Sequence, residues 1–80
     1  MHYVYILKDE SGKLYVGYSS NLRKRLRYHH YGMVQTTKGY SDSRLVWYCG
    51  FIDKKKALDF ERYLKVGSGH AFARKRFIDL

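Results

Sequence analysis

The chain has 80 residues, of which 45% are hydrophobic and 18% aromatic, which is enough for a single domain over residues 1–80 with a small, tyrosine-rich core. Sixteen lysines and arginines against seven acidic residues give a net charge of +9, which favours nucleic acid as a partner above a membrane surface. The sequence contains no bilayer-spanning apolar stretch and no signal peptide, and its single cysteine, which excludes an internal disulfide, favours a reducing, cytoplasmic compartment.

The first half of the chain predicts two strands and a helix. HYVYILK alternates as a β-strand does, with Tyr3 and Tyr5 on one face and Val4 and Ile6 on the other. DESGK predicts a hairpin loop, and KLYVGY predicts the returning strand. The polar residues SSN then supply an N-cap, so a helix is expected over residues 22–30.

The second half predicts a loop, a strand and two helices. YGMVQTTKGYSDS is typical of a loop, and RLVWYCGFI of an apolar third strand. Asp53 caps a helix that runs to about Lys65, VGSG ends it, and HAFARKRF predicts a short third helix. The order β-β-α-β-α-α predicts an α+β fold, a three-stranded antiparallel β-sheet flanked by three helices.

Two basic residues of the first predicted helix lie on its apolar side. Each residue turns a helix by about 100°, and Leu22 and Leu26 define the inward direction. Arg25 and His29 then fall on the apolar stripe or at its edge, one above the other. They are therefore expected to face the body of the protein.

The second predicted helix shows the same pattern with the opposite charge. Ala57, Phe60 and Leu64 mark its inner face, and Glu61 lies within that face. A carboxylate in such a position loses hydration, and it requires an ion pair, hydrogen bonds or a metal ion.

Two interpretations of these charges remain open. Arg25 and Glu61 form an internal salt bridge in one of them. In the other, they join the strand tyrosines and His29 in a phosphodiester site. Arginine can bind a phosphate through two hydrogen bonds, a carboxylate can hold hydrated magnesium, and tyrosine or histidine can transfer a proton.

The motifs resemble those of the GIY-YIG nuclease superfamily. YVY at residues 3–5 and YVG at 15–17 are similar to the two halves of its signature. Arg25, ten residues after Tyr15, and His29, one turn later, fit the pattern, and ALDFERYLK places the glutamate that the family carries after its third strand. VGSGHAFARKRF resembles the end of small, stand-alone, single-domain bacterial members of the excision-nuclease type.

The resemblance implies an endonuclease that uses one Mg²⁺ or Mn²⁺ ion to hydrolyse DNA, with RNA not excluded and with repair or recombination as the setting. By this analogy Tyr15 acts as, or helps generate, the general base, and Tyr5 orients the attacking water. Arg25 would bind the scissile phosphate, and Glu61 would hold the metal ion. His29 would hydrogen-bond the phosphate or assist proton transfer.

The sequence departs from the family pattern at its first motif. Tyr3 stands where glycine is usual, and Val4 where isoleucine is usual, which should alter packing near the site while retaining Tyr5. Many relatives carry a separate domain that finds DNA, whereas the predicted domain here uses the whole chain. A protein partner is therefore a candidate source of substrate recognition, and the oligomeric state is left open.

Other basic residues are candidates for contacts with the nucleic-acid backbone. They are Arg23, Lys24 and Arg27 on the first predicted helix, and Lys38 in the loop that follows it. The same basic surface would also suit a non-catalytic nucleic-acid-binding module, or a small structural protein that binds DNA through bulk charge. Metal-dependent cleavage distinguishes the nuclease from both alternatives.

Overall fold

The computed structural model describes residues 1–30 and 43–78, without the side chains of residues 28–30. Three antiparallel strands form a sheet in the order β2-β1-β3: β1 (His2–Lys8), β2 (Leu14–Ser19) and β3 (Arg44–Phe51). The helices are α1 (Leu22–His30), α2 (Lys54–Lys65) and α3 (Gly67–Ala73), the last continuing into the π-helical segment η2 (Arg74–Ile78). The predicted α+β fold and element order are confirmed.

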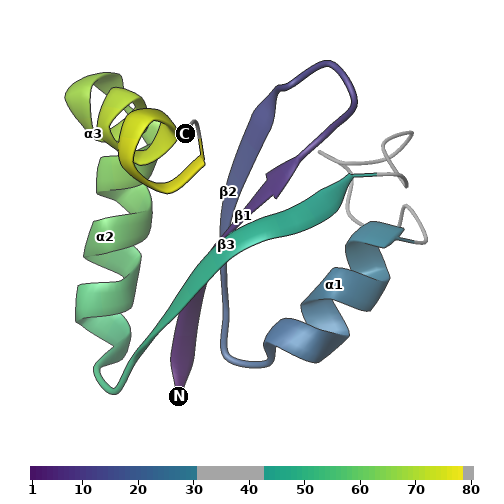
Figure 1. Cartoon of the computed structure of the whole chain (residues 1–80). Coiled ribbons are helices and arrows are strands. Elements are labelled where there is room, and N and C mark those ends of the chain that lie inside the picture. Colours follow the sequence, from purple (N-terminus) through teal and green to yellow (C-terminus); the bar gives the residue numbers. More distant parts are fainter. Residues whose placement is uncertain (31–42, 79–80) are drawn as a thin grey trace.

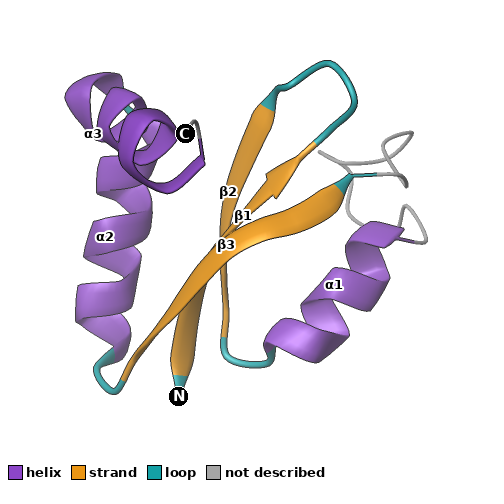
Figure 2. Ribbon diagram, in the orientation of Figure 1, coloured by secondary structure: helices purple, strands orange, loops and turns teal. Residues whose placement is uncertain are grey.

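The helices lie on opposite faces of the sheet. Helix α1 lies beside one face, and α2 and α3 lie on the other (Figure 1). The sheet therefore separates the two helical layers (Figure 2). No helix among residues 1–30 and 43–78 is long and apolar enough to cross a membrane.

Alternation along β1 assigns side chains to the two faces. Tyr5 lies opposite Gly17 of β2 and Tyr48 of β3, whereas Ile6 lies opposite Val16 and Trp47. Directly opposed residues of antiparallel strands share a face, so the predicted placement of Tyr3 and Tyr5 on one face and of Val4 and Ile6 on the other is correct.

The hydrophobic core lies between the aliphatic face of the sheet and the helices α2, α3 and η2. Its buried members are Val4, Ile6, Leu14, Ala57, Leu64 and Ala73. Aromatic rings extend the core: Trp47 of β3 stacks on Phe77 of η2, with ring centroids 4.3 Å apart, and also contacts Phe60 of α2. The Asp53 side chain accepts a hydrogen bond from the Lys55 backbone N–H, which confirms the predicted cap of α2.

The third helix begins earlier than the sequence predicts. VGSG ends α2 as expected, with Val66 extended, but α3 starts at Gly67 and not at His70. Gly67 has a φ of +44°, a left-handed conformation that glycine adopts without a steric cost. Gly69 is buried, and its Cα lies against the carbonyl group of Tyr63, so α3 packs closely on the end of α2.

A methyl group at Gly69 should disturb this packing. A Cβ there would overlap the Tyr63 carbonyl oxygen, and backbone atoms cannot move aside as a flexible side chain can. We expect Gly69→Ala to lower the free energy of unfolding by about 1–3 kcal/mol, as overpacked positions do. Urea denaturation measures the change. Ser68→Ala, at an exposed position of the same helix, is the control, and equal stability of the two variants would contradict the expectation.

Candidate functional site

The candidate site lies on the sheet face opposite the core. Tyr5 of β1 pairs with Gly17 of β2, and the next pair on this face is Leu7 with Tyr15. Tyr5 and Tyr15 are thus diagonal neighbours on one face, at a spacing of about 7–8 Å. The register of the hairpin brings together the two motifs that contain them.

The Tyr5 side chain occupies the space that the missing side chain of Gly17 leaves. A Cβ at Gly17 would overlap the Cζ and hydroxyl oxygen of Tyr5. The Tyr5 residue is only 2% exposed, so its ring lies over Gly17 of β2 and does not project into solvent. The glycine that ends the second motif therefore fixes where the tyrosine of the first motif points.

Charges from two helices act on the Tyr5 hydroxyl. Burial raises its pKa to about 12; Arg25 lowers the value, and Glu61 raises it. Arg25 belongs to α1 and Glu61 to α2, which lie on opposite faces of the sheet. Both charges influence the pKa of the same hydroxyl, although the helices that carry them lie on opposite faces of the sheet.

Glu61 is partly buried and has a basic partner. Its side chain is 18% exposed, and a carboxylate oxygen lies 3.1 Å from Nζ of Lys65, one helical turn later. Among the described residues, Glu61 therefore forms its ion pair with Lys65 and not with Arg25, the partner in the salt-bridge interpretation of the sequence. The Lys65 side chain is 50% exposed, so solvent screens the pair and the lysine is able to move away.

Tyr15 interacts with the hairpin loop. Its hydroxyl donates a hydrogen bond to Oδ2 of Asp9 at 3.2 Å, and the Lys13 ammonium lies 5.3 Å from its ring centroid. The other carboxylate oxygen of Asp9 accepts bonds from the Ser11 hydroxyl and from the backbone N–H groups of Ser11 and Lys13. Asp9 thus orients Tyr15 as well as closing the loop.

Sequence reasoning missed the contact of Asp9 with Tyr15 of the candidate site. An aspartate shortly before Ser-Gly signals an Asx-type turn, which explains its bonds to Ser11 and Lys13. Its contact with Tyr15 depends on the hairpin register, which the loop composition alone does not determine.

The remaining predicted residues divide between exposed positions and positions that lie outside the described residues. Arg23, Lys24 and Arg27 are exposed on α1, as backbone-contacting residues would be. The side chain of His29 and the whole of Lys38 lie outside the described residues.

The donor set suits at most a weakly held, hydrated cation. Among the described residues, no three histidine, cysteine, aspartate or glutamate side chains group as a metal site. Magnesium commonly keeps several waters and binds through one or two carboxylates, so a single partly buried Glu61 carboxylate fits that mode. Glu61 would be the residue that holds it.

Comparisons with known proteins agree on one family. The sequence profile of the GIY-YIG catalytic domain matches residues 1–73. The UPF0213 protein CPE1444 of Clostridium perfringens is 39% identical over 66 residues, which cover 81% of this chain and 71% of that protein. The UPF0213 protein BH0048 of Halalkalibacterium halodurans is 34% identical over 76 residues, which cover 94% of this chain and 77% of that protein.

A solved structure shows the same fold. The solution NMR structure of the UPF0213 protein BH0048 from Bacillus halodurans matches with a TM-score of 0.59 and 29% sequence identity. The match covers 95% of this chain and 85% of that one, so it includes the sheet and the helices on both of its faces.

Gly17→Ala should displace Tyr5. The added methyl group overlaps the ring, so we expect the free energy of unfolding to fall by about 1–3 kcal/mol. Combining the change with Tyr5→Leu should recover part of the loss, which a double-mutant cycle from urea denaturation measures. Gly50→Ala is the control, since its Cβ would meet mainly the flexible end of Met1; a strictly additive cycle would contradict the packing argument.

The Asp9 network should make stability depend on pH. The Ser11 hydroxyl lowers the pKa of Asp9 most, and bonds from Lys13 and Tyr15 lower it further, against burial. Because the folded pKa lies below the unfolded value of about 3.9, the stabilisation is present above that pH and is lost as the pH falls through the folded value.

We therefore expect Asp9→Asn to be less stable than the parent protein at neutral pH, with a difference that shrinks in acid. Chemical denaturation at a series of pH values measures it, with Asp59→Asn, at an exposed position of α2, as the control. A difference that stays constant down to about pH 3 would show that Asp9 acts through shape and not through charge.

Proposed function

The chain belongs to the GIY-YIG family, and on that premise we propose that it is a metal-dependent endonuclease that hydrolyses phosphodiester bonds in DNA. The observation that carries the proposal is that the tyrosines of the two motifs, Tyr5 and Tyr15, lie on one face of the hairpin, where Tyr5 is buried over Gly17. The charges of Arg25 and Glu61 both influence the pKa of the Tyr5 hydroxyl. We place the activity in the cytoplasm, in DNA repair or recombination, where a protein partner would supply further substrate recognition.

Arg25 is the proposed phosphate ligand. The residue is partly buried, so less solvent screens its charge than at the exposed arginines of α1. A guanidinium can donate two parallel hydrogen bonds to phosphate oxygens, and its charge stabilises the negative charge that develops during in-line attack.

Tyr5 is proposed to act as a hydrogen-bond donor. With its pKa raised to about 12, its hydroxyl stays protonated at neutral pH, and it can donate to the phosphate or position the attacking water. The general base must then be another group. Tyr15 is the proposed base or part of it: its oxygen would take a proton from the attacking water as its own hydroxyl proton passes along the hydrogen bond to Asp9.

Glu61 is the proposed metal ligand, and Mg²⁺ or Mn²⁺ the proposed ion. A bound divalent ion would neutralise charge on the leaving oxygen. Lys65 competes for the same carboxylate, but its side chain is half-exposed and can turn to solvent. His29 stays a candidate for phosphate hydrogen bonding, and Arg23, Lys24, Arg27 and Lys38 stay candidates for contacts along the DNA backbone.

The Lys65–Glu61 ion pair favours a second candidate function. Because Lys65 neutralises the carboxylate, Glu61 does not by itself demand a metal ion, and a purely nucleic-acid-binding module is compatible with the net charge of +9. Binding without cleavage is the outcome that this alternative requires.

Cleavage assays with matched variants test the proposal. End-labelled single-stranded, duplex, nicked and branched DNA would be incubated with magnesium, manganese or a chelator. We expect metal-dependent cuts that Glu61→Gln abolishes, and a loss of about 100-fold or more in rate for Arg25→Gln, which removes a charge-stabilising donor. Tyr15→Phe should also remove cleavage, since it deletes the proposed base.

Asp59→Asn is the matched control, because it removes an exposed carboxylate from the same helix as Glu61. Circular dichroism would check the folding of each variant. Cuts that persist in Glu61→Gln or in chelator would contradict the proposed metal-dependent mechanism, and tight binding without cuts on any substrate would favour the binding module.

A further inference from the structure

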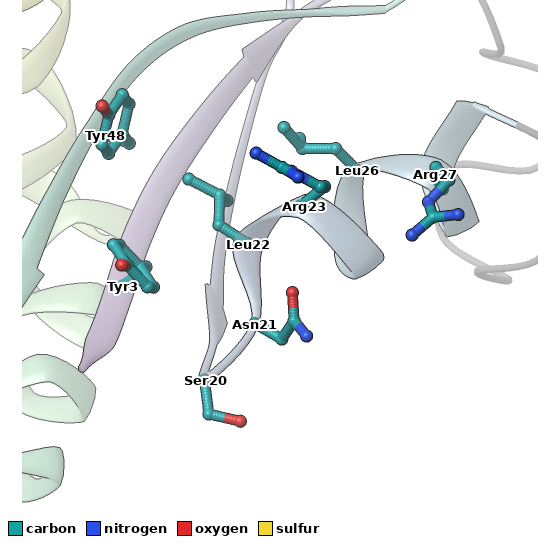
Figure 3. Close-up of a pocket in the computed structure, with 8 residues that line it drawn as sticks. All are labelled: Tyr3, Ser20, Asn21, Leu22, Arg23, Leu26, Arg27 and Tyr48. Atoms are coloured by element: carbon teal, nitrogen blue, oxygen red, sulfur yellow. The ribbon is translucent and has the colours of Figure 1, made fainter.

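A groove lies between helix α1 and the sheet, beside the candidate site. Its volume is about 710 Å³, within the range of about 300–1,000 Å³ that is usual for small-ligand sites. Figure 3 shows its lining side chains, which come from β1, β3, α1 and the turn before α1. They are Tyr3, Ser20, Asn21, Leu22, Arg23, Leu26, Arg27 and Tyr48.

We propose that this groove binds an unpaired nucleobase of the same DNA strand whose phosphate occupies the Tyr5–Arg25 site. The substrate class would then be single-stranded DNA or the unpaired part of a gapped, flapped or branched duplex. This inference rests on the proposed nuclease function, since it specifies the substrate of that site.

Two tyrosine rings supply the stacking surface. Tyr48 of β3 is 55% exposed, and its ring centroid lies 6.4 Å from that of Tyr3, with an interplanar angle of 58°. In Figure 3 both rings lie on the sheet side of the groove, and Leu22 points toward them from α1 on the other side. A planar base can stack on such an exposed ring, whichever of the four bases it is, because each presents a π-face.

The charges of the groove suit the phosphates of a bound nucleotide. Arg23 and Arg27 are both exposed, and no acidic side chain is among the described residues of the lining. Guanidinium groups bind phosphate and also stack on bases. A neutral apolar ligand would form no ion pair with either arginine. The overall charge of +9 favours the same occupant.

The groove and the candidate site lie on opposite flanks of α1. With Leu22 and Leu26 as the inward direction, a turn of about 100° per residue places Arg25 on one flank and Arg23 on the other. Arg25 acts on Tyr5, which packs over Gly17 of β2, while Arg23 lines the groove beside Tyr48 of β3. The helix therefore divides two neighbouring positions on one sheet face.

The spacing of these positions matches a continuous strand of DNA. Tyr3 and Tyr5 are alternate residues of β1 on the same face, about 7 Å apart along the strand. That length is comparable with one step along an extended single strand, so a base at Tyr3 and Tyr48 puts an adjoining phosphate near Tyr5 and Arg25. A base held in a duplex is stacked on both sides and cannot enter unless it is flipped out.

Binding to protein that cannot cut provides the test. Fluorescence anisotropy would measure the affinity of Glu61→Gln protein for one labelled oligonucleotide, free or fully paired. The added changes would be Tyr48→Ala, Tyr48→Phe and, as a control of similar exposure, Tyr63→Ala on α2, where the exposed fraction is 45%. We expect Tyr48→Ala to weaken single-strand binding about tenfold, with Tyr48→Phe near the parent value because the ring is kept.

The duplex affinity should not change in Tyr48→Ala, and Tyr63→Ala should leave both affinities unchanged. Equal losses for single strand and duplex, or an equal loss in Tyr63→Ala, would overturn the groove. If the parent protein cuts no DNA while the dependence on Tyr48 persists, the nuclease proposal fails and the groove stands. If the unaltered protein cuts DNA but Tyr48→Ala does not weaken single-strand binding in the Glu61→Gln background, the groove proposal is wrong and the nuclease proposal is retained.

Discussion

The central strand β1 is hydrogen-bonded along both of its edges, so each of its side chains must point to one face of the sheet or the other. The face with Val4 and Ile6 receives α2 and α3 and becomes the core. A domain of this size supports one such core, which leaves the opposite face for polar chemistry. Tyr5 is on that face, and the missing side chain at Gly17 lets its ring lie against β2, where charges from both helical layers reach its hydroxyl.

Local patterns were sufficient to predict the elements, because caps, turns and periodicity are properties of a few neighbouring residues. Alternation in β1 places Tyr3 and Tyr5 on one face and Val4 and Ile6 on the other, and helical periodicity identifies Arg25 and Glu61 as charges on inner faces. The sequence pattern predicts too late a start for α3, and the reason is tertiary. Gly69 packs against the end of α2, and that contact, with the left-handed conformation of Gly67, favours helix before His70.

The partners of the site residues could not be predicted in the same way. The Asp9–Tyr15 bond needs the hairpin register, since the composition of the loop gives only the turn. The Lys65–Glu61 pair has ordinary i, i+4 helix spacing, but a chain with sixteen basic residues offers many partners for one carboxylate. The resemblance to the family supplied roles for these residues, whereas only the structure shows which side chains contact them.

The electrostatics of Tyr5 link these partners to the proposed chemistry. Glu61 raises the pKa of the hydroxyl and Arg25 lowers it. A positive charge that pairs with Glu61 therefore offsets the effect of Glu61 and leaves that of Arg25. The Lys65 ammonium supplies such a charge in the structure, and the proposed divalent ion would compete with it for the same carboxylate. The displacement of Lys65 would therefore change the charge beside Tyr5 without moving the sheet. In this arrangement β1 and Gly17 keep the geometry fixed, and the exposed end of α2 sets the local charge.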